Sequence, residues 1–255
     1  MSPKVRAVMD ALAIQLGRFA VIVAGLAVAE PLGIHGFRVG LFVNVLCVGY
    51  AVAVVTWLRL WGEVGLLVRW RSWPALLWLL PFLVEAMSWL WPDGPHDQAP
   101  GVGWWTLTLL LVGVNEELTG RGAVLLRLLR DLGPVAAVVW CGVLFGAQHL
   151  SALVTSNASL LDVLTNVGLT TAYGLALAAY QARFRWLWPL ILVHAGSDLA
   201  GELTPGSPGD AVVLPAAALM LATAVALLVG RRSSVSRTGP GVTPPPQARP
   251  SASAV

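Results

Sequence analysis

The sequence contains few charged residues. Only 11% of its 255 residues are Asp, Glu, Lys or Arg, whereas a soluble domain carries about 25%. Hydrophobic residues make up 57% of the chain. This composition excludes an ordinary soluble domain and indicates a polytopic membrane protein. The net charge of +3 comes from basic residues near helix ends, so it indicates membrane topology and no nucleic-acid partner.

Cysteine and alternating polarity are also scarce. The only cysteines are Cys47 and Cys141, both in apolar stretches, which argues against a disulfide-stabilised fold. No stretch alternates apolar and polar residues with a period of two, as the strands of a membrane barrel would. Because a bilayer admits only helices or closed barrels, helices remain. The predicted fold class is therefore all-α, a polytopic integral membrane helix bundle.

Apolar runs separated by Pro, Gly and charged residues predict about eight transmembrane helices. Basic residues precede the first run, but no A-x-A-like site ends it, so we expect a retained helix and no cleaved signal peptide. The predicted helices are 11–28, 39–60, 73–91, 104–129, 134–154, 160–181, 186–203 and 211–230.

Basic residues lie on one side of this eight-helix pattern, and the opposite loops contain only Arg38. The positive-inside rule then places both termini in the cytoplasm. Abundant Ala, Val, Leu, Gly and Arg suggest a bacterial source and hence a bacterial cytoplasmic membrane. The basic residues on the predicted inner side are Lys4, Arg6, Arg59, Arg69, Arg71, Arg127, Arg130, Arg183, Arg185, Arg231, Arg232, Arg237 and Arg249.

The same pattern divides the chain into four parts. The last of them is rich in Ser, Pro, Arg and Gly and has no apolar periodicity, which is typical of disorder. The predicted parts are a cytoplasmic N-terminus (1–10), three N-terminal transmembrane helices (11–103), a group of five helices that carries the chemistry (104–230) and a disordered cytoplasmic tail (231–255).

A polar cluster interrupts the fourth run. Glu116, Glu117 and Arg121 lie inside it, where each charge costs about 2.5–3.5 kcal/mol at a helix centre. Glu117 and Arg121 are four residues apart, so they share a helix face and can form an ion pair. Glu116 is turned by about 100° from Glu117 and is free to face another partner.

Other ionisable residues lie at similar depth on the fifth and seventh helices. They are His149, His194 and Asp198, and the last two share a helix face. A carboxylate such as Glu116 can take a proton from water, and histidines can bind that water, stabilise an oxyanion or hold a divalent metal. Glu116, His149, His194 and Asp198 would also form a plausible zinc site. Either arrangement favours hydrolysis.

A few further residues complete the polar inventory. Glu85 in the third run is predicted to be a polar contact between helices, and Arg18 either reaches the inner surface or faces the bundle. Small residues near the cluster, including Gly120, Gly142 and Gly146, predict close packing of the fourth, fifth and seventh helices.

Three segments resemble motifs of the CPBP family of intramembrane proteases, which includes CAAX-processing endopeptidases and bacteriocin-processing relatives. Residues 116–121, EELTGR, fit the motif E-E-x-x-x-R. Residues 145–149, FGAQH, fit F-x-x-x-H, and residues 194–198, HAGSD, are similar to H-x-x-x-N or D. The three motifs occur in order on the expected helices, and the resemblance covers residues 104–203.

The resemblance implies an endopeptidase in which Glu116 and His149 activate water. His194 and Asp198 would bind water or stabilise the oxyanion. It leaves open whether the mechanism needs only the glutamate or also a metal such as zinc. Asp198 stands where asparagine is common, and an ionised Asp cannot donate a hydrogen bond, so a metal-binding or histidine-orienting role becomes more attractive. Glu117, Arg121 and Phe145 would support these residues.

Two alternatives stay open at this point. The same carboxylates and histidines could relay protons in a proton-coupled transporter, although the repeated halves that such proteins often contain are absent from the sequence. The chain could also be a non-catalytic immunity or scaffold protein of the same fold. The expected partners are membrane lipids and a peptide or protein substrate, which can itself be associated with the membrane. No nucleic-acid partner is expected.

Overall fold

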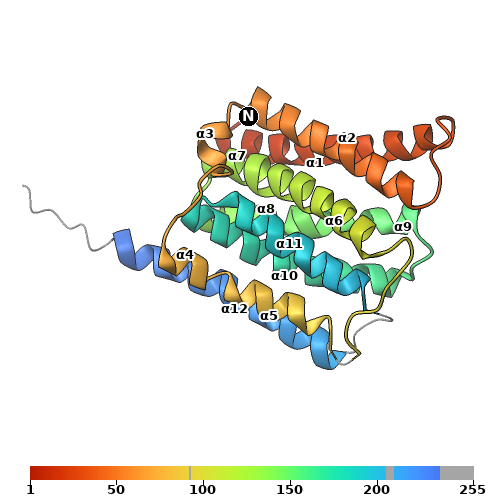
Figure 1. Cartoon of the computed structure of the whole chain (residues 1–255). Helices are drawn as coiled ribbons and strands as arrows, with labels where there is room; N and C mark the ends of the chain where they lie inside the picture. The colour runs from red at the N-terminus through yellow and green to blue at the C-terminus, as the bar shows by residue number, and fades with distance from the viewer. Residues whose placement is uncertain (92, 205–209, 236–255) are drawn as a thin grey trace, which may run out of the picture.

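The protein is a bundle of helices (Figure 1). The computed structural model describes residues 1–91, 93–204 and 210–235, and this part of the chain contains no β-strand. The predicted all-α fold class is therefore confirmed. The elements are α1 (Pro3–Ala29), α2 (Phe37–Trp57), α3 (Trp61–Val64), α4 (Trp73–Leu77), α5 (Leu80–Ser88), α6 (Val102–Glu117), η1 (Leu118–Val124), α7 (Leu125–Leu129), α8 (Pro134–Ala147), η2 (Gln148–Ser151), α9 (Ala152–Thr155), α10 (Leu160–Phe184), α11 (Leu187–Glu202) and α12 (Asp210–Val235).

Side-chain caps and prolines mark where several helices begin. The Ser2 hydroxyl accepts a hydrogen bond from the Val5 amide at the start of α1, and Pro3 occupies the first turn. Ser159 caps α10 in the same way through the Asp162 amide, at 3.1 Å. Pro134 stands in the first turn of α8. The starts of α8 and α10 match those predicted from the sequence, whereas α1 begins at Pro3, before the predicted start at residue 11, because Ser2 and Pro3 already provide a helix start.

The helices alternate in direction along the bundle. Five of them, within the described ranges, are long and apolar enough to cross a membrane: α1, α2, α8 with η2, α10 and α12. The other predicted spans correspond to α4 with α5, to α6–η1–α7 and to α11. The N-terminus and the end of α12 lie at the same end of the bundle, as an even number of crossings requires (Figure 1). The total of eight membrane crossings stays a prediction.

The boundary predicted for the tail needs a correction. Helix α12 continues to Val235, past the predicted end at residue 230, because Arg231 and its neighbours are compatible with a final helical turn. The remainder of the predicted tail, residues 236–255, lies outside the described residues. Most of the loop predicted at 204–209 lies outside them as well.

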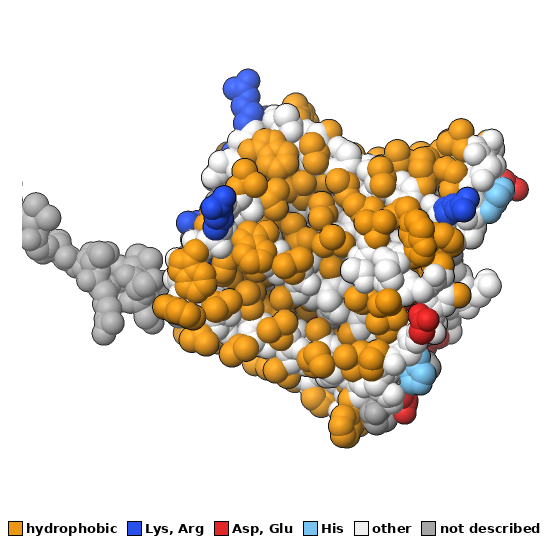
Figure 2. All heavy atoms as spheres, in the orientation of Figure 1, with side chains coloured by type: hydrophobic (Ala, Val, Ile, Leu, Met, Phe, Trp, Pro, Cys, Tyr) orange, Lys and Arg blue, Asp and Glu red, His pale blue; other side chains and the backbone are white. Residues whose placement is uncertain are grey.

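The face of the molecule in Figure 2 has an apolar belt between two ends that carry charged side chains. Hydrophobic side chains cover most of the face in view between the ends of the helices (Figure 2). Most Lys and Arg side chains in this view gather at the end that carries the N-terminus, and Asp, Glu and His gather at the other. An apolar belt of this kind matches a bilayer, so the protein is an integral membrane protein.

Glycines allow two close helix contacts beside the polar cluster. A Cβ atom on Gly142 or Gly146 would collide with α10, at Leu175 and at Thr171 respectively. Helix α8 therefore packs on α10, which corrects the predicted contact of these glycines with the fourth and seventh helices. The α6–α11 contact uses Gly113 instead, where a Cβ atom would lie 2.8 Å from the Ile191 carbonyl oxygen.

Candidate active site

The polar cluster lies where the fourth predicted helix changes its winding. Residues Leu118–Val124 form a π-helical segment between α6 and α7, all of it buried, whereas the sequence predicts one regular helix. Wider turns of this type are rare and occur frequently at functional sites. The predicted ion pair is present in spite of the changed winding, with Arg121 Nη1 2.7 Å from Glu117 Oε1 and both side chains fully buried.

Arg121 is enclosed by aromatic and backbone partners. Its guanidinium carbon lies 4.0 Å from the centre of the Phe145 ring, and Nη2 donates to the Gly174 carbonyl oxygen at 3.3 Å. The Phe145 ring thus forms a cation–π contact with the buried guanidinium, which is favourable for a charge that water cannot reach. The supporting role that the resemblance implies for both residues stays a prediction.

Glu117 also holds the histidine of the third motif. His194 Nδ1 lies 2.7 Å from the same Glu117 oxygen that accepts from Arg121. A proton on Nδ1 leaves Nε2 free as an acceptor. That Nε2 atom lies 3.9 Å from Glu116 Oε2 and 3.6 Å from Asp198 Oδ2. The sequence prediction had assigned Glu117 only to Arg121.

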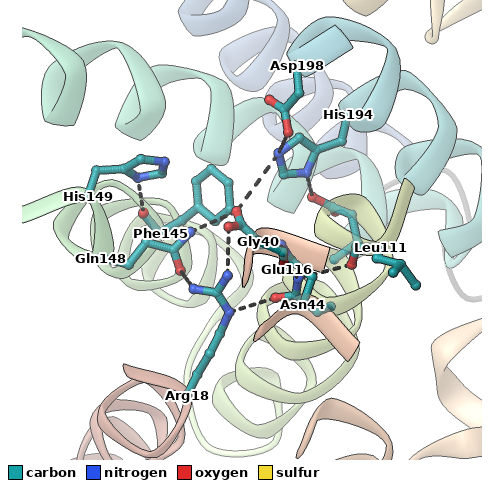
Figure 3. A network of polar contacts seen from close by, with 12 residues as sticks. Arg18, Gly40, Asn44, Leu111, Glu116, Phe145, Gln148, His149, His194 and Asp198 are labelled. Atoms are coloured by element: carbon teal, nitrogen blue, oxygen red, sulfur yellow. Dashed lines mark hydrogen bonds and ion pairs between the residues drawn. The ribbon is translucent and has the colours of Figure 1, made fainter. Parts of the chain in front are cut away.

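Glu116 is bound on its other side by residues from α1 and η2. Arg18 Nη2 donates to Glu116 Oε1 at 2.7 Å, and Gln148 Nε2 donates to Oε2 at 2.8 Å. Arg18 also donates to Asn115 Oδ1 at 2.8 Å through Nε. Figure 3 shows Arg18 rising from α1 toward Glu116 and Gln148. Arg18 therefore faces the bundle, which is one of the two positions predicted for it.

His149 contacts the backbone and the ring of Phe145. It lies in η2, a tight 3₁₀ turn, and its Nδ1 atom is 3.2 Å from the Phe145 carbonyl oxygen. The Phe145 ring contacts the rings of His149 and His194 edge-on, with centroids 5.7 and 5.6 Å away. In the described part of the chain no hydrogen bond or ion pair joins His149 to Glu116 (Figure 3).

A cavity of about 380 Å³ opens beside these groups. His149, His194 and Asp198 contribute to its lining, as does Glu85 from α5. Glu85 accepts hydrogen bonds from Trp89 Nε1 at 2.6 Å and from the Ser197 hydroxyl at 2.8 Å, so the predicted polar contact between helices is present. Glu116 is not among the lining residues in the described ranges. Its Oε2 atom lies 3.9 Å from Nε2 of His194, which does line the cavity.

A larger hollow elsewhere contains none of the predicted site residues. It measures about 710 Å³, is widely open, and lies at the loop that precedes α6, beside His96 and Trp104. Depth within the bundle and the gathering of ionisable groups both favour the smaller cavity as the candidate site.

The predicted metal ligands do not form a coordination shell. No group of three or more His, Cys, Asp or Glu side chains is placed to hold a metal ion in the part of the chain that the structure describes. Both oxygens of Glu116 accept hydrogen bonds from Arg18 and Gln148, and the nearest contacts of His194 Nε2 exceed 3.5 Å. This arrangement does not fit a zinc site, and the metal requirement stays a prediction for experiment.

The fold and the site together define a class: an all-α integral membrane protein with buried ionisable groups beside a cavity. Residues 98–200 match the family model described as type II CAAX prenyl endopeptidase Rce1-like. The predicted resemblance to the CPBP family of intramembrane proteases is thereby confirmed over this stretch, which supports a protease with a peptide or protein substrate. Comparisons with curated proteins and with solved structures gave no match.

Proposed function

We propose that this protein is an intramembrane endopeptidase in which Glu116 activates a water molecule for attack on a peptide bond. The observation that carries the proposal is the approach of Glu116 Oε2 and His194 Nε2, 3.9 Å apart. A water oxygen about 2.8 Å from each atom would fit this spacing as a hydrogen-bonded triangle. Glu117 supports it by fixing the orientation of His194.

The reaction follows from these positions. Glu116 accepts a proton from the water while the water oxygen bonds to the carbonyl carbon of the peptide. Glu116 later returns that proton to the nitrogen of the departing amine as the carbon–nitrogen bond breaks. The developing oxyanion needs donors on the cavity side. His149, from η2, lines that side together with Asp198, and we assign His149 to the water or the oxyanion there. Asp198 faces His194 Nε2 and assists in placing it.

We also propose the orientation of the protein in its membrane. Most of the Lys and Arg side chains in view lie at the end that holds the N-terminus (Figure 2). By the positive-inside rule this end faces the cytoplasm, so both termini are cytoplasmic in a bacterial inner membrane. Accessibility labelling of single cysteines introduced at residue 2 and residue 35 tests this orientation. We expect residue 2 to be labelled from the cytoplasmic side of the membrane and residue 35 from the opposite side.

Proteolysis of reporter peptides by the purified full-length protein tests the function. We expect Glu116→Gln, His149→Ala and His194→Ala to lower turnover by about 10²–10⁴-fold, the range for acid–base catalysis. Glu63→Gln is the matched control, because Glu63 is a half-exposed carboxylate in an ion pair with Arg130. Full activity of both Glu116→Ala and His149→Ala would overturn the proposal. Proton-coupled flux in sealed vesicles without proteolysis would favour the transporter alternative.

A further inference from the structure

Arg18 reaches the candidate site from a helix outside the matched stretch. It lies in the middle of α1 and is 7% exposed, while the family match covers only residues 98–200. Its three nitrogens contact three different acceptors, on Asn115, Glu116 and Gln148. Hydrogen bonds from a buried guanidinium to three side chains at once fix both its position and its direction, so this geometry indicates a built site for it.

Arg18, Glu116 and Gln148 form a closed ring of hydrogen bonds. Arg18 Nη1 donates to Gln148 Oε1 at 3.2 Å, and Gln148 Nε2 donates to Glu116 Oε2 at 2.8 Å. Arg18 Nη2 closes the ring at Glu116 Oε1, at 2.7 Å. Because the guanidinium can only donate, it fixes which end of the Gln148 amide faces Glu116. The carboxylate is therefore held at both of its oxygens.

Asn115 anchors the guanidinium from the neighbouring position. Its Oδ1 accepts from Arg18 Nε, while its Nδ2 donates to Asn44 Oδ1 on α2 at 2.8 Å and to the Leu111 carbonyl oxygen at 3.0 Å. Asn115 is fully buried. Residues from α1, α2, α6 and η2 thus hold one another around Glu116.

The two adjacent glutamates therefore have separate arginines. Glu117 pairs with Arg121 from the same segment, at 2.7 Å. Glu116 pairs with Arg18 from another helix, also at 2.7 Å. A bound guanidinium limits the rotation of a carboxylate more than an ammonium would, since its planar fork fixes direction as well as charge.

We propose that Arg18 is a positioning residue of the active site, which holds Glu116 so that its second oxygen faces His194. The proposal rests on the catalytic role proposed above for Glu116. It makes α1 part of the catalytic unit, although the predicted division of the chain and the family match both place the chemistry in later helices. A purely structural Arg18 would brace α1 against the bundle without affecting turnover.

Arg127 offers a matched control for that distinction. Its Nε donates to Asp10 Oδ2 at 2.8 Å, so this arginine also joins α1 to the motif-bearing segment, and its side chain is 12% exposed. It also pairs with Asp131 and has no contact with Glu116. Arg127→Gln therefore removes an arginine bridge to α1 while leaving the ring around Glu116 intact.

Reporter proteolysis by full-length variants in detergent provides the test. We expect Arg18→Gln to lower kcat by about 10²-fold, the effect of a small misplacement of a reacting group, with KM unchanged. Arg18→Lys should recover part of this loss, because it keeps the charge without the fork. Arg127→Gln should leave kcat within about threefold of wild type. Equal kcat for Arg18→Gln and wild type, or equal losses for Arg18→Gln and Arg127→Gln, would overturn the proposal.

A stability cycle separates this proposal from the function on which it rests. The melting temperatures of Arg18→Gln, Glu116→Gln and the double variant are compared with wild type. We expect the double variant to lose less than the sum of the single losses, because each single change leaves a buried group unpaired. Additive losses in melting temperature would show that Arg18 and Glu116 do not interact, and this would overturn the proposal. A wild-type protein that cleaves no peptide, with a non-additive cycle, would overturn the proposed function but not the contact.

Discussion

His194 and Arg121 share one carboxylate oxygen of Glu117, each at 2.7 Å. The histidine and the arginine come from different parts of the chain, so Glu117 links the motif at 116–121 to the motif at 194–198. The carboxylate next to it, Glu116, is left to contact Arg18 and Gln148. Two consecutive glutamates thus have different roles because a helix turns them to different sides.

The first prediction concerns the stability of the Glu117 ion pair. Glu117→Gln should lower the free energy of unfolding by about 3–5 kcal/mol, because Arg121 would keep a fully buried charge without its partner. Thermal unfolding in detergent measures the change. Glu63→Gln, which breaks a half-exposed pair with Arg130, should cost less than about 1 kcal/mol. Similar losses for both variants would contradict the buried pair.

The second prediction concerns metal dependence. Exhaustive chelation should leave proteolysis unchanged, because Glu116 is already engaged by Arg18 and Gln148 and the described residues contain no group of ligands placed around a common point. Turnover is measured before and after chelation. A loss of activity that added zinc restores would show that the helices rearrange around a metal.

The third prediction concerns the residue at the end of the third motif. Asp198→Asn should keep turnover within about tenfold of wild type, because an amide of the same size still faces His194 Nε2 and can donate a hydrogen bond to it. Asp198→Ala removes the polar group and should cost about 10²-fold. If the asparagine variant is as inactive as the alanine variant, the negative charge facing His194 Nε2 at 3.6 Å is itself required.

The fourth prediction concerns the contact between α8 and α10. Gly146→Ala should destabilise the protein by about 1–3 kcal/mol, because its methyl group would meet the Thr171 side chain and the Val167 carbonyl oxygen. Gly168→Ala in α10 is the control. No atom lies within 4 Å of a Cβ atom there, so this change should be neutral or stabilise by up to about 1 kcal/mol. Equal effects of the two substitutions on the melting temperature would refute the close contact.

Local spacing predicts part of the site well. The pairing of Glu117 with Arg121 and the approach of His194 to Asp198 both follow from residues four apart on a helix. Apolar runs and their breakers also predict the helix order, since both depend on neighbouring residues. The family motifs named the same positions, and their proposed catalytic roles remain to be tested.

Other features depend on tertiary packing and have no local signal. The π-helical segment at 118–124 lies among apolar residues and small residues that would also suit a regular helix. Gly142 and Gly146 face α10 because α8 is rotated in a way that spacing alone does not determine. Arg18, inside the apolar part of α1, was a visible anomaly in the sequence, but its acceptor Glu116 lies 98 residues away.

That separation has a consequence for how the protein is made. Synthesis proceeds at about 5–20 residues per second, so Arg18 exists for about 5–20 s before the ribosome adds Glu116. An unpaired arginine at the centre of a helix costs about 2.5–3.5 kcal/mol in a bilayer. Until Glu116 and Gln148 have been added, α1 therefore carries its arginine without the partners that hold it in the folded protein.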